Sequence, residues 1–568
     1  MRLNRNKKEV FSMKKLISLL MALVMLLSMC AVAAAEEKTL TTVTVYPPDA
    51  TVTSGNPPSY INKWFNDEGL DIQVWAYSPE KTNAILASGD LPDVMYVTYK
   101  DLQTMIEGNM VLNLEDHLDK LPHVTADPVI MTAVNYVREF RSAGTEQLWA
   151  IPALINVQAE GDDTGRNAIR VLWDVYYAIG APEIKDVYDL IPVMKQMMEY
   201  KPAADDGTKT WGTCLNSGTD SQYWRSIELW YKWFGYELDN LQYLLETDMF
   251  NAKYTSILEA SRDSMYYKGL KFFNTCFREG VLDPDSINND RNTQKAKVET
   301  SNAIMFPAGS TPGWPQKYLP IHLEGQKLYA ENWGSPYGGD MFFVINPKTA
   351  HVDECLKFID MMADADFYFR IYNGTEDLGL WYTGEDGHVY PTKLGTDRYL
   401  VPGFEATFSN GEQPQMWLDR PVRSFTHALS YTGPEGPRRA RGMQEWPEIK
   451  EELNKNESNT QWREHFGFNT FTELLKAQDA YILTSPLTNV ASFCTPVDEW
   501  TQLSLDALRD VMVTGSWKMV YAETDEEFDA IWDQMMKDCE ELGGADIVAM
   551  RLEDLAKAQE IKDSLSAQ

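Results

Sequence analysis

The stretch "LDIQVWAYSPEKTNAILASGDLPDVMYV" (residues 70–97) contains the pattern that decides the fold. Residues 70–77 predict a strand and residues 80–88 a short helix. Gly89 suits the left-handed residue that ends a helix, and the proline three residues later prevents the helix from continuing. Residues 93–97 then predict a second strand. Short connections between strand, helix and strand indicate parallel pairing.

The sequence before this stretch extends the same alternation. Residues 39–46, "TLTTVTVY", are rich in β-branched side chains that alternate and predict an earlier strand, and residues 59–68 predict the helix that follows it. The resulting β-α-β-α-β order implies a mostly parallel sheet with helices on both faces. Ligands of such sheets bind at strand ends and nearby loops, so Asp93 and Tyr96 are candidates for ligand contact. Capping of the local turn is an alternative role for Asp93.

The N-terminal region has the order of a secretory signal. A pair of lysines precedes the apolar run 16–29, and the small residues "AVAAA" (31–35) follow it. We therefore predict a signal peptide at residues 1–35 and a protein that is secreted or held at the outer face of the cell membrane. A lipid anchor at Cys30 is the alternative, although the methionine before it fits a lipidation signal poorly.

Composition excludes several classes of function. The chain has 84 Asp and Glu against 51 Lys and Arg, which argues against a nucleic-acid partner, because phosphate binding needs basic patches. The cysteines after the predicted signal are odd in number and far apart: Cys214, Cys276, Cys355, Cys494 and Cys539. This spacing supports neither a disulfide framework nor a zinc site. We therefore expect no metal and no cofactor.

Several motifs occur in one order along the chain. They are "ASGDLPDV", "LWAIP", "IRVLWDVYYAIGAPEIKDVYDL", "AIMFPAG", "GGDMFFVIN", "YNGTEDLGLWY" and a C-terminal "VMVTG…EEFDAIWDQMMKDCEELGG". Together they resemble family 1 extracellular solute-binding proteins of carbohydrate ABC importers, in particular the long, lipoprotein-type group of Gram-positive bacteria. The resemblance covers nearly all of residues 36–568.

The resemblance implies a fold and a division of the chain. The fold is α/β, a two-lobe periplasmic-binding-protein-like fold of the class II type, with an interlobe cleft and a multi-segment hinge. Lobe 1 would comprise residues 36–150 and 340–400. Lobe 2 would comprise residues 151–339 and 401–568, with a helix-rich C-terminus.

The resemblance also implies a function without catalysis. A monomer would capture a sugar or oligosaccharide by lobe closure and deliver it to the permease of an ABC importer in the membrane. Two alternatives stay open at this stage: a secreted glycoside hydrolase, and a binding protein for a peptide or another non-sugar solute. The chain departs from the family where a calcium loop is common. There it reads "KPAADDGTKTWG" (201–212), which keeps Asp205 and Asp206 but loses the alternating ligand spacing, so we expect a solvated turn.

Aromatic residues are abundant, with 17 Trp, 28 Tyr and 22 Phe. A sugar has apolar C–H faces that pack on aromatic rings and a rim of hydroxyls that need polar partners. Aromatic and polar residues in the connecting segments are therefore the candidates for substrate binding, with half-buried packing as the alternative for each. The predicted set is Trp314, Trp333, Trp381, Tyr337, Asp93, Tyr96, Trp224, Arg225, Asp340 and Tyr382.

Overall fold

The N-terminal alternation forms most of a five-stranded sheet. In the computed structural model, β1 (Thr41–Tyr46) pairs in parallel with β2 (Leu70–Val74) and β3 (Val94–Thr98). β12 (Met341–Ile345) lies antiparallel to β3, and β4 (Ile151–Pro152) pairs with β12, which gives the order β2-β1-β3-β12-β4. The predicted α/β fold class is confirmed.

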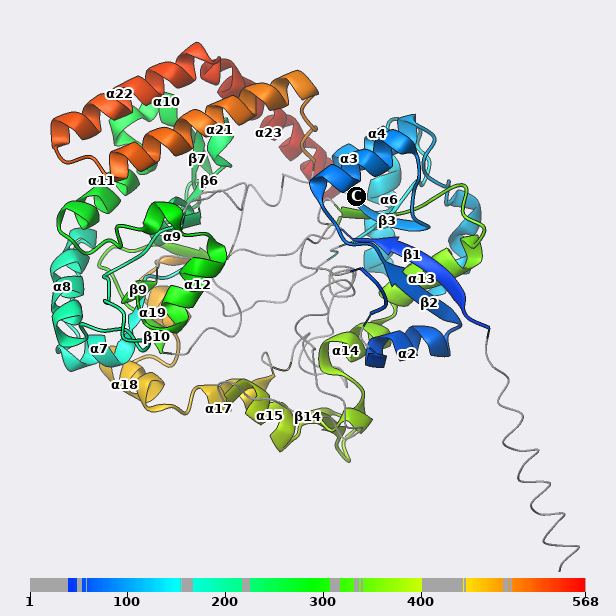
Figure 1. Cartoon of the computed structure of the whole chain (residues 1–568), viewed down its shortest axis with the longest axis horizontal. Helices are drawn as coiled ribbons and strands as arrows, with labels where there is room; N and C mark the ends of the chain where they lie inside the picture. Colours follow the sequence, from blue (N-terminus) through cyan, green and yellow to red (C-terminus); the bar gives the residue numbers. More distant parts are fainter. Residues whose placement is uncertain are drawn as a thin grey trace, which may run out of the picture.

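The structure describes residues 39–566 apart from 48–53, 58, 154, 156–166, 217–224, 307–316, 331–336, 339–340, 401–442, 444–445, 484–489 and 491–492. Figure 1 shows two lobes, and lobe 1 is the one around the five-stranded sheet. Its helices are α2 (Ser59–Asp67), α3 (Pro79–Ser88), α4 (Tyr99–Glu107), η1 (Glu115–Lys120), α5 (Pro122–Ala126), α6 (Pro128–Phe140) and α13 (Val352–Ala363).

Local chemistry sets both ends of α3, and its end at Gly89 is the one that the sequence predicts. The Ser78 side chain accepts a hydrogen bond from the Lys81 N–H at the start of the helix. At the other end Gly89 has φ of 67°, and its N–H donates to the Ile85 carbonyl. The chain can therefore turn within a few residues into β3, whose first four residues are all buried.

Lobe 2 contains two antiparallel three-stranded sheets. One has the order β10-β5-β9 and the other β6-β7-β8. The strands are β5 (Arg170–Leu172), β6 (Tyr236–Leu238), β7 (Leu245–Asp248), β8 (Lys253–Ser256), β9 (Met305–Phe306) and β10 (Tyr318–Pro320). The helices before residue 300 are α7 (Trp173–Ala178), η3 (Val187–Asp189), α8 (Leu190–Tyr200), α9 (Arg225–Trp233), η4 (Leu241–Tyr243), α10 (Ile257–Ala260), η5 (Ser261–Asp263), α11 (Met265–Arg278), η6 (Ser286–Asn288) and α12 (Arg291–Glu299).

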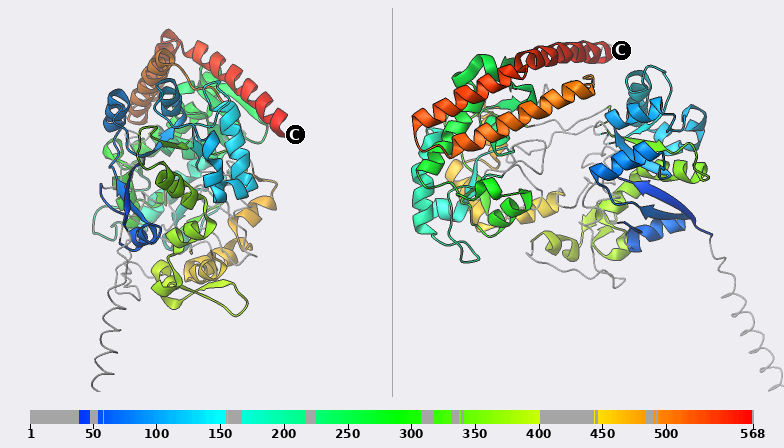
Figure 2. Two further views of the ribbon diagram at one scale, coloured as in Figure 1. Left: turned by 90° about the vertical axis from the view of Figure 1, so that its right-hand side faces the viewer. Right: turned by 45° about the horizontal axis from the view of Figure 1, so that its top comes forward.

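The C-terminal region is helical, as predicted. α21 (Glu499–Val520), α22 (Asp525–Glu541) and α23 (Gly544–Ser566) follow one another, and α21 packs against α22 and α11. Both views in Figure 2 show these orange and red helices on the outside of lobe 2. Among the described residues, no helix has the length and apolar character needed to cross a membrane.

Two further sheets have two short strands each. β11 (Leu328–Ala330) pairs in parallel with β15 (Tyr481–Leu483), and β13 (Trp381–Thr383) forms a hairpin with β14 (Val389–Pro391). The remaining helices are α14 (Ala365–Asn373), η7 (Glu376–Leu378), α15 (Lys393–Leu400), α17 (Pro447–Leu453), α18 (Glu457–Phe466) and α19 (Phe471–Lys476). Figure 1 shows α14, α15, α17 and α18 along one side of the molecule, from lobe 1 to lobe 2.

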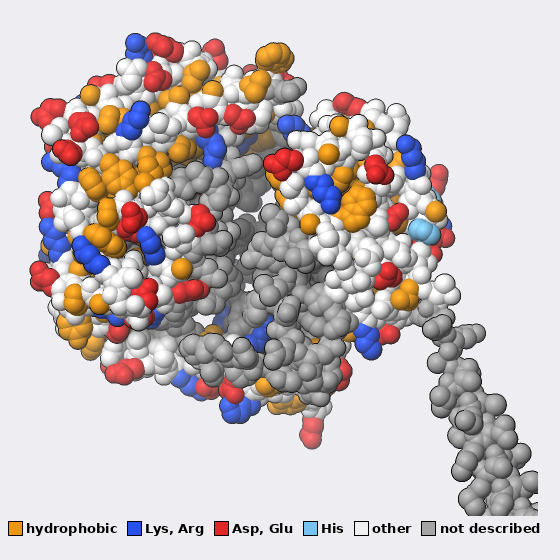
Figure 3. Space-filling model, viewed as in Figure 1, with side chains coloured by type: hydrophobic (Ala, Val, Ile, Leu, Met, Phe, Trp, Pro, Cys, Tyr) orange, Lys and Arg blue, Asp and Glu red, His pale blue; other side chains and the backbone are white. Residues whose placement is uncertain are grey.

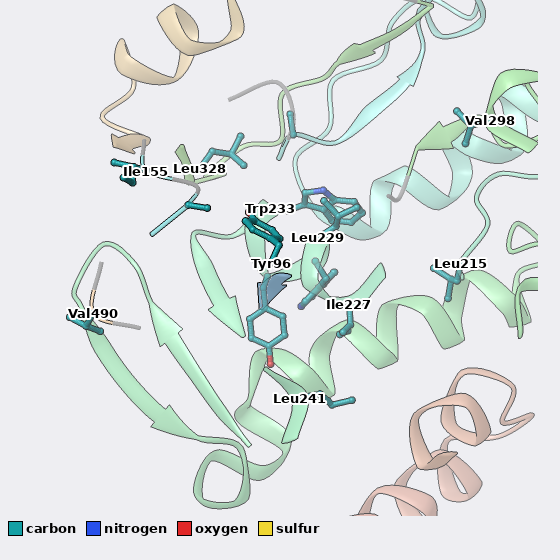
Figure 4. Packing of buried hydrophobic residues seen from close by; sticks show 14 of the residues in the cluster. Tyr96, Ile155, Leu215, Ile227, Leu229, Trp233, Leu241, Val298, Leu328 and Val490 are labelled. Carbon is teal, nitrogen blue, oxygen red and sulfur yellow. The ribbon is translucent and has the colours of Figure 1, made fainter. Parts of the chain in front are cut away.

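Burial of apolar side chains joins these parts into one continuous core. Figure 4 shows members of this cluster from close by, among them Ile155, Leu328 and Val490. On the surface, Figure 3 shows acidic and basic side chains scattered over both lobes. The residue boundaries predicted for the lobes stay predictions, and the predicted signal peptide lies outside the described residues.

Candidate functional site

The edge of the lobe 1 sheet that faces lobe 2 is the carboxyl edge of its parallel strands. Figure 1 shows the β1 arrow directed toward lobe 2, and β2 and β3 run parallel to β1. The chain leads from β1 to β2 on one side, whereas after β3 it continues to β4 on the other side, so the connections diverge between β1 and β3. Ligands of open α/β sheets bind at such a switch point, outside the carboxyl ends of the strands.

Aromatic residues occupy this edge. Tyr46 is the last residue of β1, and Trp75 and Tyr77 follow the end of β2. The Tyr46 and Tyr77 ring centroids lie 5.8 Å apart. The Lys81 ammonium lies 5.2 Å from the centroid of Trp75 and 5.6 Å from that of Tyr46. We call Tyr46, Trp75, Tyr77 and Lys81 the edge cluster.

Hydrogen bonds hold the edge cluster against the first turn of α3. The Tyr46 hydroxyl donates to the Ser78 carbonyl at 3.0 Å and lies 2.9 Å from the Thr82 hydroxyl. The Lys81 ammonium donates to the Ala76 carbonyl at 3.1 Å. Tyr46 is buried, whereas Trp75 is half-buried and presents part of its ring to the surface. The cluster is therefore a positioned aromatic surface with a cation beside it.

The electrostatics of the cluster favour the neutral form of the Tyr77 phenol. Burial raises the pKa of Tyr77, and the nearby Tyr46, Asp101 and Glu80 raise it further. The Tyr77 hydroxyl is therefore protonated at neutral pH and can both donate and accept a hydrogen bond. A hydroxyl next to an aromatic face suits a ligand whose surface is partly apolar and partly hydroxylated.

The prediction from sequence missed Trp75 and Tyr77 because both fell inside the predicted strand 70–77. The observed strand ends at Val74, so these two residues lie beyond the sheet. A signal was present: the apolar-polar alternation of "LDIQV" stops at residue 74, and the residues after a parallel strand lie at its ligand-binding edge.

Asp93 lies at the other end of its strand. It directly precedes β3, so it lies at the amino end, away from the carboxyl edge. One carboxylate oxygen accepts from the Thr44 N–H and hydroxyl at 2.8 and 2.6 Å, and the other accepts from the Thr349 hydroxyl at 2.6 Å. Burial acts to raise the pKa of Asp93, but these hydrogen bonds bring it below its usual value. The carboxylate joins β1 to the turn after β12, and its predicted ligand role stays a prediction.

Three other predicted residues lie among packed rings. Tyr96 is buried in the middle of β3, with its ring centroid 5.1 Å from that of Phe343. Tyr337 is half-buried, and its ring packs against Tyr136 and Phe493 at 5.0 and 5.1 Å. Trp381 is half-buried in the β13–β14 hairpin, where its indole N–H donates to a backbone carbonyl. Their ligand contacts also stay predictions.

The remaining predicted residues divide into two groups. Tyr382, in the same hairpin as Trp381, is 48% exposed and packs on Tyr390. Arg225 begins α9. Four lie outside the described residues, namely Trp224, Trp314, Trp333 and Asp340. The structure thus brings none of the described predicted residues into the edge cluster.

In the turn at residues 201–212, Asp205 pairs with the ammonium of Lys317, a residue from outside the turn. The Lys317 ammonium lies 3.0 Å from one Asp205 oxygen and donates to the Glu299 carbonyl at 2.8 Å and to the Ser301 hydroxyl at 2.5 Å. Lys201 binds the other Asp205 oxygen at 2.9 Å. Burial acts to raise the pKa of Asp205, but the hydrogen bonds from Lys201, Ser301 and Lys317 lower it far below its usual range. The Lys317 ammonium therefore lies against the Asp205 carboxylate, which would otherwise be open to a metal ion.

Metal-ligating side chains do not gather elsewhere in the part of the chain that the structure describes. There, no group of three or more His, Cys, Asp or Glu side chains could hold a metal ion. The five cysteines after the predicted signal are free thiols, and all but Cys494 are buried.

Comparison of sequences finds no relative: no family model and no curated protein matches this chain. Comparison of structures finds many. One is an S. pneumoniae ABC-transporter substrate-binding protein, FusA, in complex with kestose; it is 15% identical, the match covers 93% of this chain and 100% of that one, and the TM-score is 0.60. A second is an HMO-binding solute-binding protein associated with an ABC transporter of Bifidobacterium longum infantis, at 14% identity, coverage of 91% and 98%, and a TM-score of 0.54.

A third similar structure is the alginate-binding protein AlgQ2 without calcium ion. It is 13% identical, with 92% of this chain and 98% of that chain covered and a TM-score of 0.53. At these identities the likeness concerns the fold. The chain therefore has the two-lobe fold of solute-binding proteins over nearly its whole length.

Proposed function

We propose that this protein is an extracellular solute-binding protein that captures a saccharide between its lobes and delivers it to an ABC importer. The observation that carries the proposal is the edge cluster, an aromatic surface at the carboxyl edge of the parallel strands, on the side of lobe 1 that faces lobe 2. The resemblance of the ordered motifs and the likeness to sugar-binding proteins of the same fold support it.

The physical mechanism is capture by lobe closure. Ligand contacts from both lobes form together only when the lobes are closed, so binding shifts the population toward the closed state. The rings of Trp75 and Tyr77 would cover the apolar faces of a sugar, and hydroxyl groups at the edge would pair with its rim. A micromolar dissociation constant corresponds to about −8 kcal/mol, which a few such contacts can supply.

The similar structures also suggest a class of ligand. The similar structures include proteins described with kestose, with HMO and with alginate, all of them oligomeric or polymeric saccharides. We therefore infer an oligosaccharide rather than a single sugar. Binding involves no covalent step, so we expect no catalysis, and a monomer is sufficient because one chain supplies both lobes.

Isothermal titration calorimetry tests the proposal. The chain is titrated with fructo-oligosaccharides, human milk oligosaccharides and alginate oligosaccharides, and the same glycans are assayed for released reducing ends. We expect heat of binding with at least one glycan and no new reducing ends. Release of reducing ends would favour the hydrolase alternative, and binding of peptides alone would favour a peptide carrier.

A matched pair of substitutions places the site. Truncating a partly buried aromatic ring that covers a ligand removes about 1.5–3 kcal/mol, which is at least tenfold in affinity. Trp75→Ala should therefore weaken binding about tenfold or more. Tyr200→Ala is the control, because Tyr200 is 61% exposed at the end of α8, and Figure 1 shows α8 on the side of lobe 2 away from lobe 1. Equal affinities of the two variants would show that the edge cluster is not the binding surface.

The cellular location is a separate part of the proposal. Cleavage after Ala35 would release a soluble protein, and a lipid on Cys30 would retain it at the membrane. Intact-mass measurement of the protein from the host's membrane and culture fractions distinguishes the two, because the two processing routes leave different N-termini and only one adds fatty acyl mass.

A further inference from the structure

Two connections between the lobes lie in direct contact. The Ala153 N–H, just after β4, donates to the Met341 carbonyl at the start of β12 at 2.8 Å. Gly338 has φ of 89°, and a Cβ there would lie 3.0 Å from the Ala153 carbonyl oxygen and 3.1 Å from the Pro152 Cβ. The absence of a side chain at Gly338 therefore lets the second connection lie against the first.

A third stretch of chain joins them from the C-terminal region. It consists of Val490 and residues 493–498, and we call it the strap. β15 before it is paired with β11, and α21 after it packs in lobe 2. Phe493 nevertheless packs against α6 of lobe 1, with its ring centroid 5.2 Å from that of Tyr136.

The contact is a cluster of four rings. Phe493 also lies 6.2 Å from Phe140 and 5.1 Å from Tyr337, with interplanar angles of 89° and 67°. Tyr136 lies 5.0 Å from Tyr337 and 5.2 Å from Phe140. Phe493 is 5% exposed, so the strap places a nearly buried ring on lobe 1. We call Tyr136, Phe140, Tyr337 and Phe493 the hinge cluster.

Two residues later the strap is held by lobe 2. The Thr495 N–H donates to an Asp554 carboxylate oxygen of α23 at 2.9 Å. The other Asp554 oxygen lies 3.3 Å from Arg551, whose guanidinium forms a buried bidentate pair with Asp239 at 2.6 and 3.1 Å. The backbone of the strap is thus fixed to lobe 2 while the ring of Phe493 is fixed to lobe 1.

We propose that the hinge cluster is the pivot of the two lobes, and that the strap couples the C-terminal helices of lobe 2 to lobe 1 through Phe493. Edge-to-face rings are attractive over a broad range of centroid distances, about 4.5–7 Å, so the lobes can rotate a little about this cluster without losing the contact. Residues near a hinge axis move little during closure, whereas the lobe tips move far. The inference goes beyond saccharide binding and holds for any ligand.

Hydrogen exchange and X-ray scattering of the full chain without ligand test the pivot. Phe493→Ala removes the ring that joins the strap to lobe 1. We expect amide exchange in residues 128–141 and 337–345 to rise about tenfold or more, because these backbones lose a buried packing partner. We also expect a larger radius of gyration, because the lobes are less tightly held.

Phe277→Ala is the matched control. Phe277 is a half-buried ring on α11 with an edge-to-face contact to Tyr521, 4.8 Å between centroids, and both lie in lobe 2. Its truncation should raise exchange locally and leave the scattering curve unchanged. The pivot is refuted if Phe493→Ala gives the scattering curve of the unsubstituted protein and raises exchange only within residues 490–498.

A milder variant keeps the proposal testable if Phe493→Ala does not fold. Phe493→Leu retains most of the side-chain volume but removes the aromatic edge. We expect smaller changes of the same kind in the exchange of residues 128–141. Unaltered exchange in that segment, together with an unaltered scattering curve, would overturn the pivot, because the ring contacts would then contribute nothing to interlobe order.

Discussion

Replacement of Lys317 by methionine tests whether a lysine ammonium acts as the internal cation of the turn at residues 201–212. Methionine preserves most of the length and the apolar part of the side chain. It removes the charge and the three donated hydrogen bonds, to Asp205, Ser301 and the Glu299 carbonyl. The variant therefore leaves Asp205 with Lys201 and Ser301 as partners.

The magnitude follows from these contacts. A hydrogen bond to a charged group contributes about 1.5–3 kcal/mol when it is buried. The side chains of Lys317 and Asp205 are 29% and 49% exposed, so solvent screening reduces the ion pair to the surface range, about 0–1 kcal/mol. The part-buried bond to the Ser301 hydroxyl and the exposed bond to the Glu299 carbonyl together add about 1 kcal/mol. We expect a loss of about 1–2 kcal/mol in the free energy of unfolding.

The pH dependence has a definite sign. The pKa of Asp205 is lowered by the fold, so its contribution to stability is complete above the pKa of an unfolded aspartate, near 4, and is lost as the pH falls through the lowered folded value. The difference between the unsubstituted protein and Lys317→Met should therefore be constant at neutral pH. Both proteins share the same unfolded state, so the difference should shrink only as the pH falls below about 4 toward the lowered folded value, where Asp205 becomes protonated.

Urea denaturation at pH 7 and pH 3.5, followed by tryptophan fluorescence, measures this difference. Millimolar calcium or a chelator should leave the midpoint of the unsubstituted protein unchanged, because the ammonium already neutralises Asp205. Lys195→Met is the control, since Lys195 pairs with the exposed Glu279 outside the turn. A midpoint that rises with calcium in the unsubstituted protein, or a Lys317→Met variant as stable as Lys195→Met, would refute the reasoning.

Three further substitutions test the structural parts around the site. Asp93→Asn weakens the bonds to Thr44 and Thr349 and should cost about 1–3 kcal/mol in urea unfolding without altering glycan affinity; a selective loss of affinity would instead support the predicted ligand role of Asp93. Arg551→Met leaves the Asp239 carboxylate buried without its guanidinium, and thermal unfolding should reveal a loss of about 3–5 kcal/mol. Gly338→Ala forces a Cβ against the first connection at positive φ, and calorimetry should show a lower melting temperature.

The fold was largely predictable because its first half depends on local signals. The helix that ends at Gly89 and the strand that begins five residues later follow from residues adjacent in sequence. The position of β12 does not, because Phe343 pairs with Tyr96 across nearly half of the chain. No local pattern specifies that an antiparallel strand enters between β3 and β4; the expectation of a returning segment near residue 340 came from the resemblance.

The candidate site was harder to predict because aromatic residues in connecting segments can either contact a ligand or pack inside the protein. The rule that aromatic rings in connecting segments form ligand surfaces fits Tyr337 as well as any other ring. Tyr337 lies in the hinge cluster, whereas Trp75 lies at the sheet edge, one residue after an observed strand. The two environments differ in the contacts of the ring. Tyr337 packs against Phe493, which is far away in sequence, whereas Trp75 lies beside Lys81, only six residues further along the chain.

Truncations in the edge cluster and in the hinge cluster should therefore affect binding in different ways, and experiments can distinguish the two. Truncation within the edge cluster removes contact area from the ligand and should raise the dissociation rate without changing the shape of the free protein. Truncation in the hinge cluster leaves the contact surface intact but broadens the range of interlobe orientations, which lowers the population that can close correctly. A Tyr337→Ala variant that binds weakly, yet whose free form scatters like the unsubstituted protein, would place Tyr337 at the ligand rather than at the pivot.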